Sequence, residues 1–284
     1  MNKRNALELA AEDIATAARA IDIQRKVSRR GGRDSFSILD CPVADCAGAD
    51  PKRLERAVNR ALRVGAAFGL LNSCLSRSVV LCRLLRENGM AYYGGGASRA
   101  EAESVLYLTA GGQRIAFIGF NEVGPPEAWA TDTEAGAARL SKPLLEEKLR
   151  EATAGAPIVF AMVQCTNENE PVPWPSQVRL FHSAIDLGAT ITGSSSAHRA
   201  MGLEFYRGRL IIYGLGNFLF DQMQTVHHRR GMIARHHFHD GRHVQTELIP
   251  YIIHDYCRPR LLQGGPAREL MDEVFRYSRG PVFD

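Results

Sequence analysis

Apolar residues recur along the chain with two different periods, and these periods predict where strands and helices lie. From residue 35 onward, short apolar runs of strand length alternate with stretches in which apolar residues return every three or four positions. Strands are predicted at 35–40, 66–73, 156–165 and 189–193, and hairpins at 105–121, 203–214 and 231–250. Helices are predicted at 5–20, 76–88, 141–153 and 176–187, and two more begin at 50 and 266.

Turn residues mark the loops of two hairpins and one connection. The pairs Arg207-Gly208 and Asp240-Gly241 suit tight hairpin turns, because each ends in a glycine that tolerates the left-handed backbone. The segment 91–98 contains three consecutive glycines and is predicted as a turn.

The order of these elements predicts an α/β protein. Strands alternate with helices in the first part, which implies parallel pairing, and the later hairpins add antiparallel pairing. We therefore expect an α/β sandwich with mixed β-sheets. In such folds the functional loops follow the carboxyl ends of the strands. The long loop at 121–140 is a further functional candidate because of its length.

Composition and charge narrow the class of protein. The 284 residues are 45% hydrophobic and 23% charged, as in ordinary globular domains, and a net charge of +4 does not by itself indicate nucleic-acid binding. No apolar run is long enough for a membrane span, and the alanine-rich start lacks the apolar segment of a secretion signal. The six cysteines form no Cys-x-x-Cys pair. We expect a cytoplasmic protein with no membrane span and no nucleic-acid partner.

Two regions are predicted. Residues 1–34 are expected to form an N-terminal helix and a basic linker, which is either solvated or a docking arm for a partner. Residues 35–284 are expected to form the main domain.

Polar side chains that follow the predicted strands are candidates for a site. Asn72 and Cys74 lie at the end of the second strand, Gln164 and Glu168 lie at the end of the third, and His198 follows the fourth. An imidazole there suits acid–base chemistry near neutral pH, whereas the alternative is a structural histidine held by hydrogen bonds. Cys74 precedes a predicted helix, where a thiolate is favoured, although a lone cysteine is more often buried and inert.

The segment "GLEFYRGRLIIYGLGNFLFDQ", residues 202–222, carries a family resemblance. It resembles the CapA family of poly-γ-glutamate capsule biosynthesis proteins, whose wording there is close to E-x-Y-x-G-x-x-I-x-Y-x-L-G-N-F-x-F-D-Q. The segments "AWATDTEAG" and "RIAFIGFN" are similar to the family as well, and the resemblance covers about residues 35–278. It implies a calcineurin-like metallophosphoesterase fold, an αββα sandwich, for the main domain.

The loops that bear the family's metal ligands depart from its pattern. The family's Asn-Asn-His followed by Asp corresponds here to residues 72–74, Asn-Ser-Cys, with Arg77 at the Asp position. The family's His-Trp-Gly-x-Glu corresponds to Gln164 through Glu168, and its last loop to "SSSAH", which ends at His198. The family's first Gly-Asp strand has no counterpart before residue 35.

These departures bear on the cofactor. All nine histidines follow residue 180, so the early loops offer no imidazole, and Arg77 would be repelled by two divalent ions. We hypothesise that the two-metal site is lost and expect no cofactor, while leaving a divalent metal open.

The polar residues at the strand ends are then predicted to act without a metal pair. His198 and Glu168 are predicted to carry out acid–base catalysis. Asn72, Cys74, Arg77, Gln164 and Asn217 are predicted to contact the substrate. For each of them, ordinary loop solvation, capping or bracing of the strand-end loops is the alternative.

Two other sequence features are weaker indications of a functional site. His237 and His239 share one face of a predicted strand, but the chain offers no carboxylate beside them except at the turn, so an exposed hairpin is preferred over a metal site. The glycines at 94–96 precede a helix but lack the lysine and spacing of a phosphate-binding loop.

Two functions remain open. In the first, the chain is a divergent CapA-like enzyme that acts on a peptide or polyamide, by hydrolysis or epimerisation in a peptide natural-product or capsule pathway. In the second, it is a metal-free pseudoenzyme that binds a peptide or a catalytic partner protein. A homo-oligomer that completes the site across an interface is also open.

Overall fold

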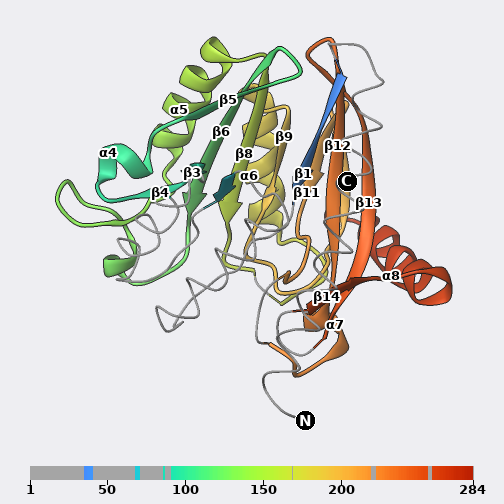
Figure 1. Cartoon of the computed structure of the whole chain (residues 1–284). Helices are drawn as coiled ribbons and strands as arrows, with labels where there is room; N and C mark the ends of the chain where they lie inside the picture. Colours follow the sequence, from blue (N-terminus) through green and yellow to red (C-terminus); the bar gives the residue numbers. More distant parts are fainter. Residues whose placement is uncertain are drawn as a thin grey trace.

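The computed structural model of the chain (Figure 1) describes residues 35–40, 68–70, 86, 91–167, 169–218, 222–254 and 258–283. The predicted N-terminal helix and linker lie outside these ranges, so the domain boundary at residue 35 stays a prediction. No helix in the described ranges has the length and apolar character needed to cross a membrane.

The larger sheet has six strands in the order β10-β11-β9-β8-β6-β5. Its inner pairs, β6·β8, β8·β9 and β9·β11, are parallel, and the pairs at both edges are antiparallel. The strand bounds are β5 Leu106–Ala110, β6 Gln113–Asn121, β8 Ile158–Gln164, β9 Ile191–Ser194, β10 Leu203–Tyr206 and β11 Arg209–Ile212. The predicted mixed α/β sheet is confirmed: helices connect β6 to β8 and β8 to β9, β9 reaches its parallel neighbour β11 through β10, and hairpins join the antiparallel pairs.

The second sheet is antiparallel throughout, in the order β1-β12-β13-β14. Its strands are β1 Ser35–Asp40, β12 Arg230–His239, β13 Arg242–His254 and β14 Arg258–Leu261. β12 and β13 form the predicted hairpin, and φ values of 47° at Asp240 and 70° at Gly241 identify its two-residue turn. β1 pairs antiparallel with β12 and so belongs to this sheet rather than to the parallel series.

The remaining described strands are short and form two-stranded sheets. β2 Phe68–Leu70 pairs in parallel with β3 Ala91–Tyr93, and β4 Gly95–Gly96 pairs with β7 Gly136–Ala137. The prediction of a simple turn at 91–98 was therefore wrong, because tertiary pairing converts most of it into two short strands. The helices are α4 Arg99–Ala102, α5 Lys142–Gly155, α6 Pro175–Asp186, α7 Val226–Arg229 and α8 Gly264–Tyr277, with a 3-10 turn η1 at Pro126–Ala128.

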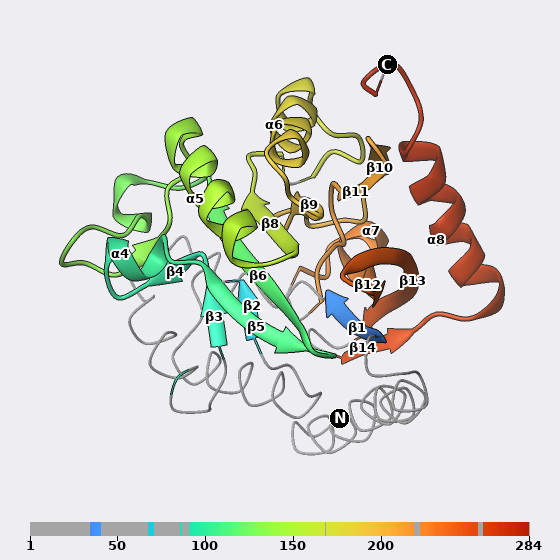
Figure 2. The same ribbon diagram turned by 90° about the horizontal axis from the view of Figure 1, so that it is seen from above.

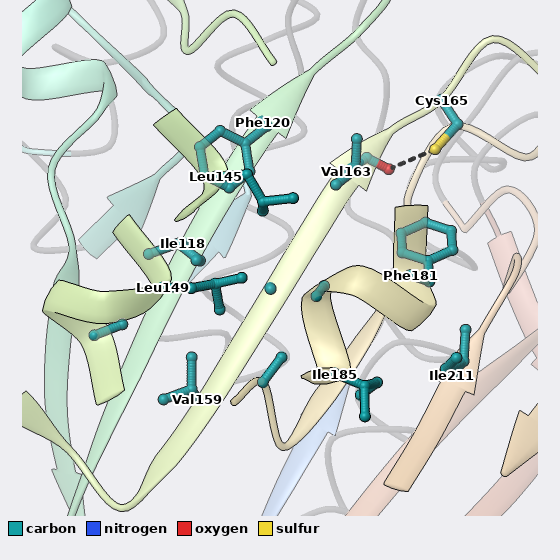
Figure 3. Packing of buried hydrophobic residues seen from close by; sticks show 14 of the residues in the cluster. Ile118, Phe120, Leu145, Leu149, Val159, Val163, Cys165, Phe181, Ile185 and Ile211 are labelled. Carbon is teal, nitrogen blue, oxygen red and sulfur yellow. Dashed lines mark hydrogen bonds between the residues drawn. The ribbon is translucent and has the colours of Figure 1, made fainter. Parts of the chain in front are cut away.

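The two faces of β8 show how the layers are held together. Val159, Ala161 and Val163 face α5 and α6, where they pack with Leu149 and Phe181. Figure 3 shows this buried layer, including Val163, Leu149 and Phe181. Because both faces of β8 are buried, its sequence is continuously apolar rather than alternating.

The opposite face of β8 packs against the second sheet. Phe160 stacks on Phe117 with ring centroids 5.0 Å apart and meets Phe238 of β12 edge-on at 6.0 Å. Leu270 and Val274 of α8 pack against β11 and β12 together, which closes one side of the sandwich. Figure 2 shows α5 and α6 on one side of the larger sheet, the second sheet on the other, and α8 at the edge.

Candidate functional site

The parallel strands β6, β8 and β9 end at the same edge of the larger sheet, as expected for functional loops. Asn121 and Gln164 are paired neighbours at the ends of β6 and β8, and both side chains are buried. The carbonyl oxygen of Gln164 accepts a hydrogen bond from the backbone N–H of Glu122 at 2.9 Å, which fastens the two strand ends. The structure thus places Gln164 at the edge where the sequence predicted a site.

The serines before His198 fasten the β9 loop to the β8 loop. The backbone N–H of Cys165 donates to Ser196 Oγ at 2.9 Å, and the same hydroxyl donates to the Cys165 carbonyl oxygen at 2.7 Å. Ser194 Oγ lies 3.1 Å from Ser196 Oγ. The serines that replace the family's usual residues therefore bind the segment just before His198 to the loop after β8. This role was not predicted from the sequence.

Cys165 lies in the same buried layer but is not a nucleophile. Figure 3 shows its thiol turned toward the carbonyl oxygen of Val163, 3.8 Å away. Burial, with a smaller contribution from the charge of Glu122, raises the pKa of the Cys165 thiol to about 12. The thiol therefore stays protonated at neutral pH.

His198 is buried, with 8% of its surface exposed, and its ring is held by Asn217. His198 Nδ1 lies 2.9 Å from Asn217 Oδ1. The two hydrogens of Asn217 Nδ2 are shared among three acceptors: the carbonyl oxygens of His198 at 3.3 Å and His228 at 3.1 Å, and Gln222 Oε1 at 3.3 Å. Carbonyl oxygens cannot donate, so the carboxamide nitrogen must face them and the oxygen must face the ring.

This orientation decides the tautomer of His198. Because Asn217 Oδ1 is an acceptor, Nδ1 of His198 carries the proton in the neutral ring, and Nε2 is the basic nitrogen. A ring fixed in this way suits either proton transfer at Nε2 or coordination of a metal by that atom.

The position of Asn217 depends on two further features. Tyr251 of β13 donates from its hydroxyl to the Asn217 carbonyl oxygen at 2.6 Å, which ties the loop to the second sheet. Gly216, immediately before it, has a φ of 85°, a conformation that favours glycine. Asn217 is a site residue predicted from sequence, whereas Tyr251 carries no local signal and was missed.

His228 joins the same region from α7 and was also missed. Its Nε2 lies 3.1 Å from Oδ1 of Asn169, in the loop after β8, and its Nδ1 lies 2.8 Å from Thr225 Oγ1. Burial lowers the pKa of the His228 imidazole, and the charges of His198, Arg199 and His227 lower it further.

Several predicted site residues fall outside the described ranges. These are Glu168, Asn72, Cys74 and Arg77. Their predicted roles therefore stay predictions, as does a substrate contact for Gln164 or Asn217. The structure brings together His198 and Asn217 of the predicted set and places Gln164 at the end of the neighbouring strand.

The described ranges do not by themselves provide the ligands of a metal centre. Within them, no group of three or more His, Cys, Asp or Glu side chains could hold a metal ion. In particular, His237 and His239 of the β12–β13 hairpin belong to no such group. The described residues thus do not fit a two-metal centre on their own, and the hypothesis of a lost metal pair remains a prediction.

One solved structure aligns with much of this chain at low sequence identity. The 5'-nucleotidase precursor from Thermus thermophilus aligns over 81% of this chain and 46% of its own, with 10% sequence identity and a TM-score of 0.45.

Two curated relatives share sequence with the chain. It is 24% identical over 177 residues to the capsule biosynthesis protein CapA of Bacillus anthracis, covering 61% of this chain. It is 28% identical over 163 residues to the PGA biosynthesis protein CapA of Bacillus subtilis (strain 168), covering 57% of this chain. The matched part spans 43% of the length of each relative.

The sequence model of one protein family, described as bacterial capsule synthesis protein PGA_cap, matches residues 80–222. This range includes the strands β5 to β11, the serines at 194–196, His198 and Asn217. The chain therefore belongs to the PGA_cap family of bacterial capsule synthesis proteins.

Proposed function

We propose that the chain acts on a peptide or polyglutamate-type polyamide, with His198 as the general acid and base. The observation that carries this proposal is the carboxamide of Asn217, which holds the proton of His198 on Nδ1. Nε2 is then the basic atom, in a ring with little conformational freedom. Membership of a capsule synthesis family supports the substrate class, since two relatives are named for capsule or PGA biosynthesis.

The fixed ring suits hydrolysis of an amide. Nε2 of His198 would take a proton from a water molecule as its oxygen attacks the amide carbonyl carbon. The protonated ring would then give that proton to the leaving nitrogen as the C–N bond breaks, which restores the neutral imidazole. The same atom could instead remove the proton from the α-carbon of a residue, which is the first step of epimerisation.

A turnover assay with one substitution tests this role. The full chain is incubated with γ-linked glutamate oligomers and with α-linked glutamyl peptides, and released amines and α-carbon inversion are followed. We expect His198→Gln to lower the rate about 100-fold or more, since glutamine cannot accept the proton. His239→Gln, on the exposed end of β12, serves as the control. Equal rates for wild type and His198→Gln would contradict the proposal.

The alternative is a metal-free pseudoenzyme that binds a peptide or a partner protein. It is favoured by Asn-Ser-Cys and Arg77 at positions where the family's metal ligands stand. Calorimetry with the same oligomers and elemental analysis of the purified chain separate the two functions. Binding without turnover, and without stoichiometric metal, would support the pseudoenzyme. Turnover lost in His198→Gln would reject it.

A further inference from the structure

His228 has contacts that connect three segments around His198. Asn217 Nδ2 donates to the carbonyl oxygens of both His198 and His228, at 3.3 and 3.1 Å. The backbones of the two histidines are therefore linked through one carboxamide. The His228 ring then reaches across to Asn169, 59 positions earlier in the sequence. The loops after β8, β9 and β11 are thereby joined through one hydrogen-bonded series.

The partners of the His228 ring determine what it does. Nε2 faces Oδ1 of Asn169, so it donates a proton there, and Nδ1 can accept from the hydroxyl of Thr225. Thr225 also receives the backbone N–H of His228 as the N-cap of α7. Both ring nitrogens are thus used in holding protein groups, which distinguishes this ring from that of a proton-transfer residue.

His228 binds Asn169 in the loop between β8 and α6, which follows Gln164. Within it, Asn167 accepts the Glu170 N–H at 3.1 Å and donates to the Val172 carbonyl oxygen at 3.1 Å. Gln177 accepts the Trp174 N–H at 2.9 Å. These bonds fix the described residues of the loop relative to one another, and the His228–Asn169 bond ties them to the segment that carries Asn217.

We propose that His228 is a positioning residue that holds the β8–α6 loop beside His198 through its bond to Asn169. This inference rests on the proposed function, because it assigns the loop to the same site. The lowered pKa of His228, caused by burial and by the nearby His198, Arg199 and His227, supports it. It favours the neutral ring, in which Nδ1 can accept from Thr225 while Nε2–H donates to Asn169.

Amide hydrogen exchange of the full chain tests the inference without any substrate. In His228→Ala, the amides of Glu170 and Trp174 should exchange about fivefold faster, which corresponds to the loss of one neutral hydrogen bond. His228→Gln should restore slow exchange, since its terminal amide nitrogen can take the place of Nε2 as donor to Asn169. The buried amides of β8 report global stability and should not change.

The neighbouring histidine of the same helix is the matched control. His227 lies 3.8 Å from Glu273 of α8 rather than against the β8–α6 loop, so His227→Ala should leave the Glu170 and Trp174 amides at the wild-type rate. Unchanged exchange in His228→Ala, or a glutamine variant no better than alanine, would overturn the inference. The role of His198 is decided separately by turnover, so the two proposals fail independently.

Discussion

Asn217 determines much of the site's geometry through a single side chain. Its oxygen binds the His198 ring, and its nitrogen binds three acceptors, among them the carbonyl oxygens of His198 and His228. Aspartate of the same size lacks the donor, and leucine lacks both donor and acceptor. The side chain is therefore suited to fixing one ring tautomer and one loop conformation together.

Substitution of Asn217 should separate these two effects. In Asn217→Asp, a carboxylate oxygen would face buried carbonyl oxygens, so we expect the free energy of unfolding to fall by about 1–3 kcal/mol in urea denaturation. Nitrogen NMR should still find the His198 proton on Nδ1, because the acceptor remains. In Asn217→Leu, both tautomers should appear. A ring that stays purely Nδ1-protonated in the leucine variant would show that Asn217 does not set the tautomer.

His198 and Asn217 were both predicted from sequence as site residues, but their hydrogen bond to each other was not. They are 19 positions apart, and their hydrogen bond depends on how the β9 and β11 loops meet. The serines at 194 and 196 were noted only as replacements, because the bonds of Ser196 to Cys165 span 31 positions of sequence. Motif spacing shows which residues lie at strand ends, and only the folded chain shows what they touch.

Gly208 and Gly216, in the two loops on either side of β11, require glycine for different reasons. Gly208, in the β10–β11 turn, has a φ of 73° and open space where a Cβ would point. Gly216 has a φ of 85°, and a Cβ there would lie 2.7 Å from the Arg230 carbonyl oxygen and 3.0 Å from Gly231 Cα. The first position needs glycine for conformation only, and the second needs it for conformation and for space.

This difference predicts two unequal substitutions. Gly208→Ala should lower the free energy of unfolding by about 1–2 kcal/mol, the cost of the left-handed conformation for a residue with a Cβ. Gly216→Ala should lower it by more, since the backbone of β12 must also move, and it should displace Asn217 from His198. Urea denaturation of both variants measures the difference. An equal loss would mean that the close approach at Gly216 relaxes without cost.

Elements with strong local patterns were predicted with nearly correct bounds. β8 was expected within 156–165 and lies at Ile158–Gln164, and α6 was expected at 176–187 and lies at Pro175–Asp186. The failure at 91–98 has a clear cause. Its two short strands exist only because β2 and β7 provide backbone partners, and the glycines themselves favour a turn.

The packing of the two sheets buries one histidine completely. His236 of β12 faces inward beside Phe160, with ring centroids 5.6 Å apart, and its Nδ1 lies 2.8 Å from Thr246 Oγ1. Burial lowers the pKa of His236 to about 3, and His243 and His237 add to the effect. The alternation along the hairpin was read from sequence only for the outward His237 and His239, so this inward histidine was missed.

The buried ring makes the stability of the whole molecule depend on pH. In the unfolded chain the ring binds a proton near pH 6.5, but in the folded chain it does so only near pH 3. Between these values the unfolded state alone is protonated. The free energy of unfolding therefore falls as the pH falls below about 6.5, by up to about 1.4 kcal/mol per pH unit.

Removing the titrating group should flatten this dependence. We expect urea midpoints of His236→Gln to change less between about pH 7 and about pH 4 than those of wild type. His239→Gln, at the exposed end of the same strand, is the control and should keep the wild-type fall. If the slopes of wild type and His236→Gln were the same, His236 would not be the group that links stability to acid.

Local pattern along the chain was enough to identify most elements of the larger sheet and its mixed pairing, because hydrophobic period and turn residues act over a few positions. Family wording in 202–222 was enough to point to the capsule synthesis family. The contacts of His198 with Asn217, of Ser196 with Cys165 and of His228 with Asn169 required the folded chain, since each joins segments that are distant in sequence. The burial of His236 required the packing of the two sheets. Hydrogen bonds and burial between such segments arise from the packing of the strand-end loops and of the two sheets, and no local pattern encodes them.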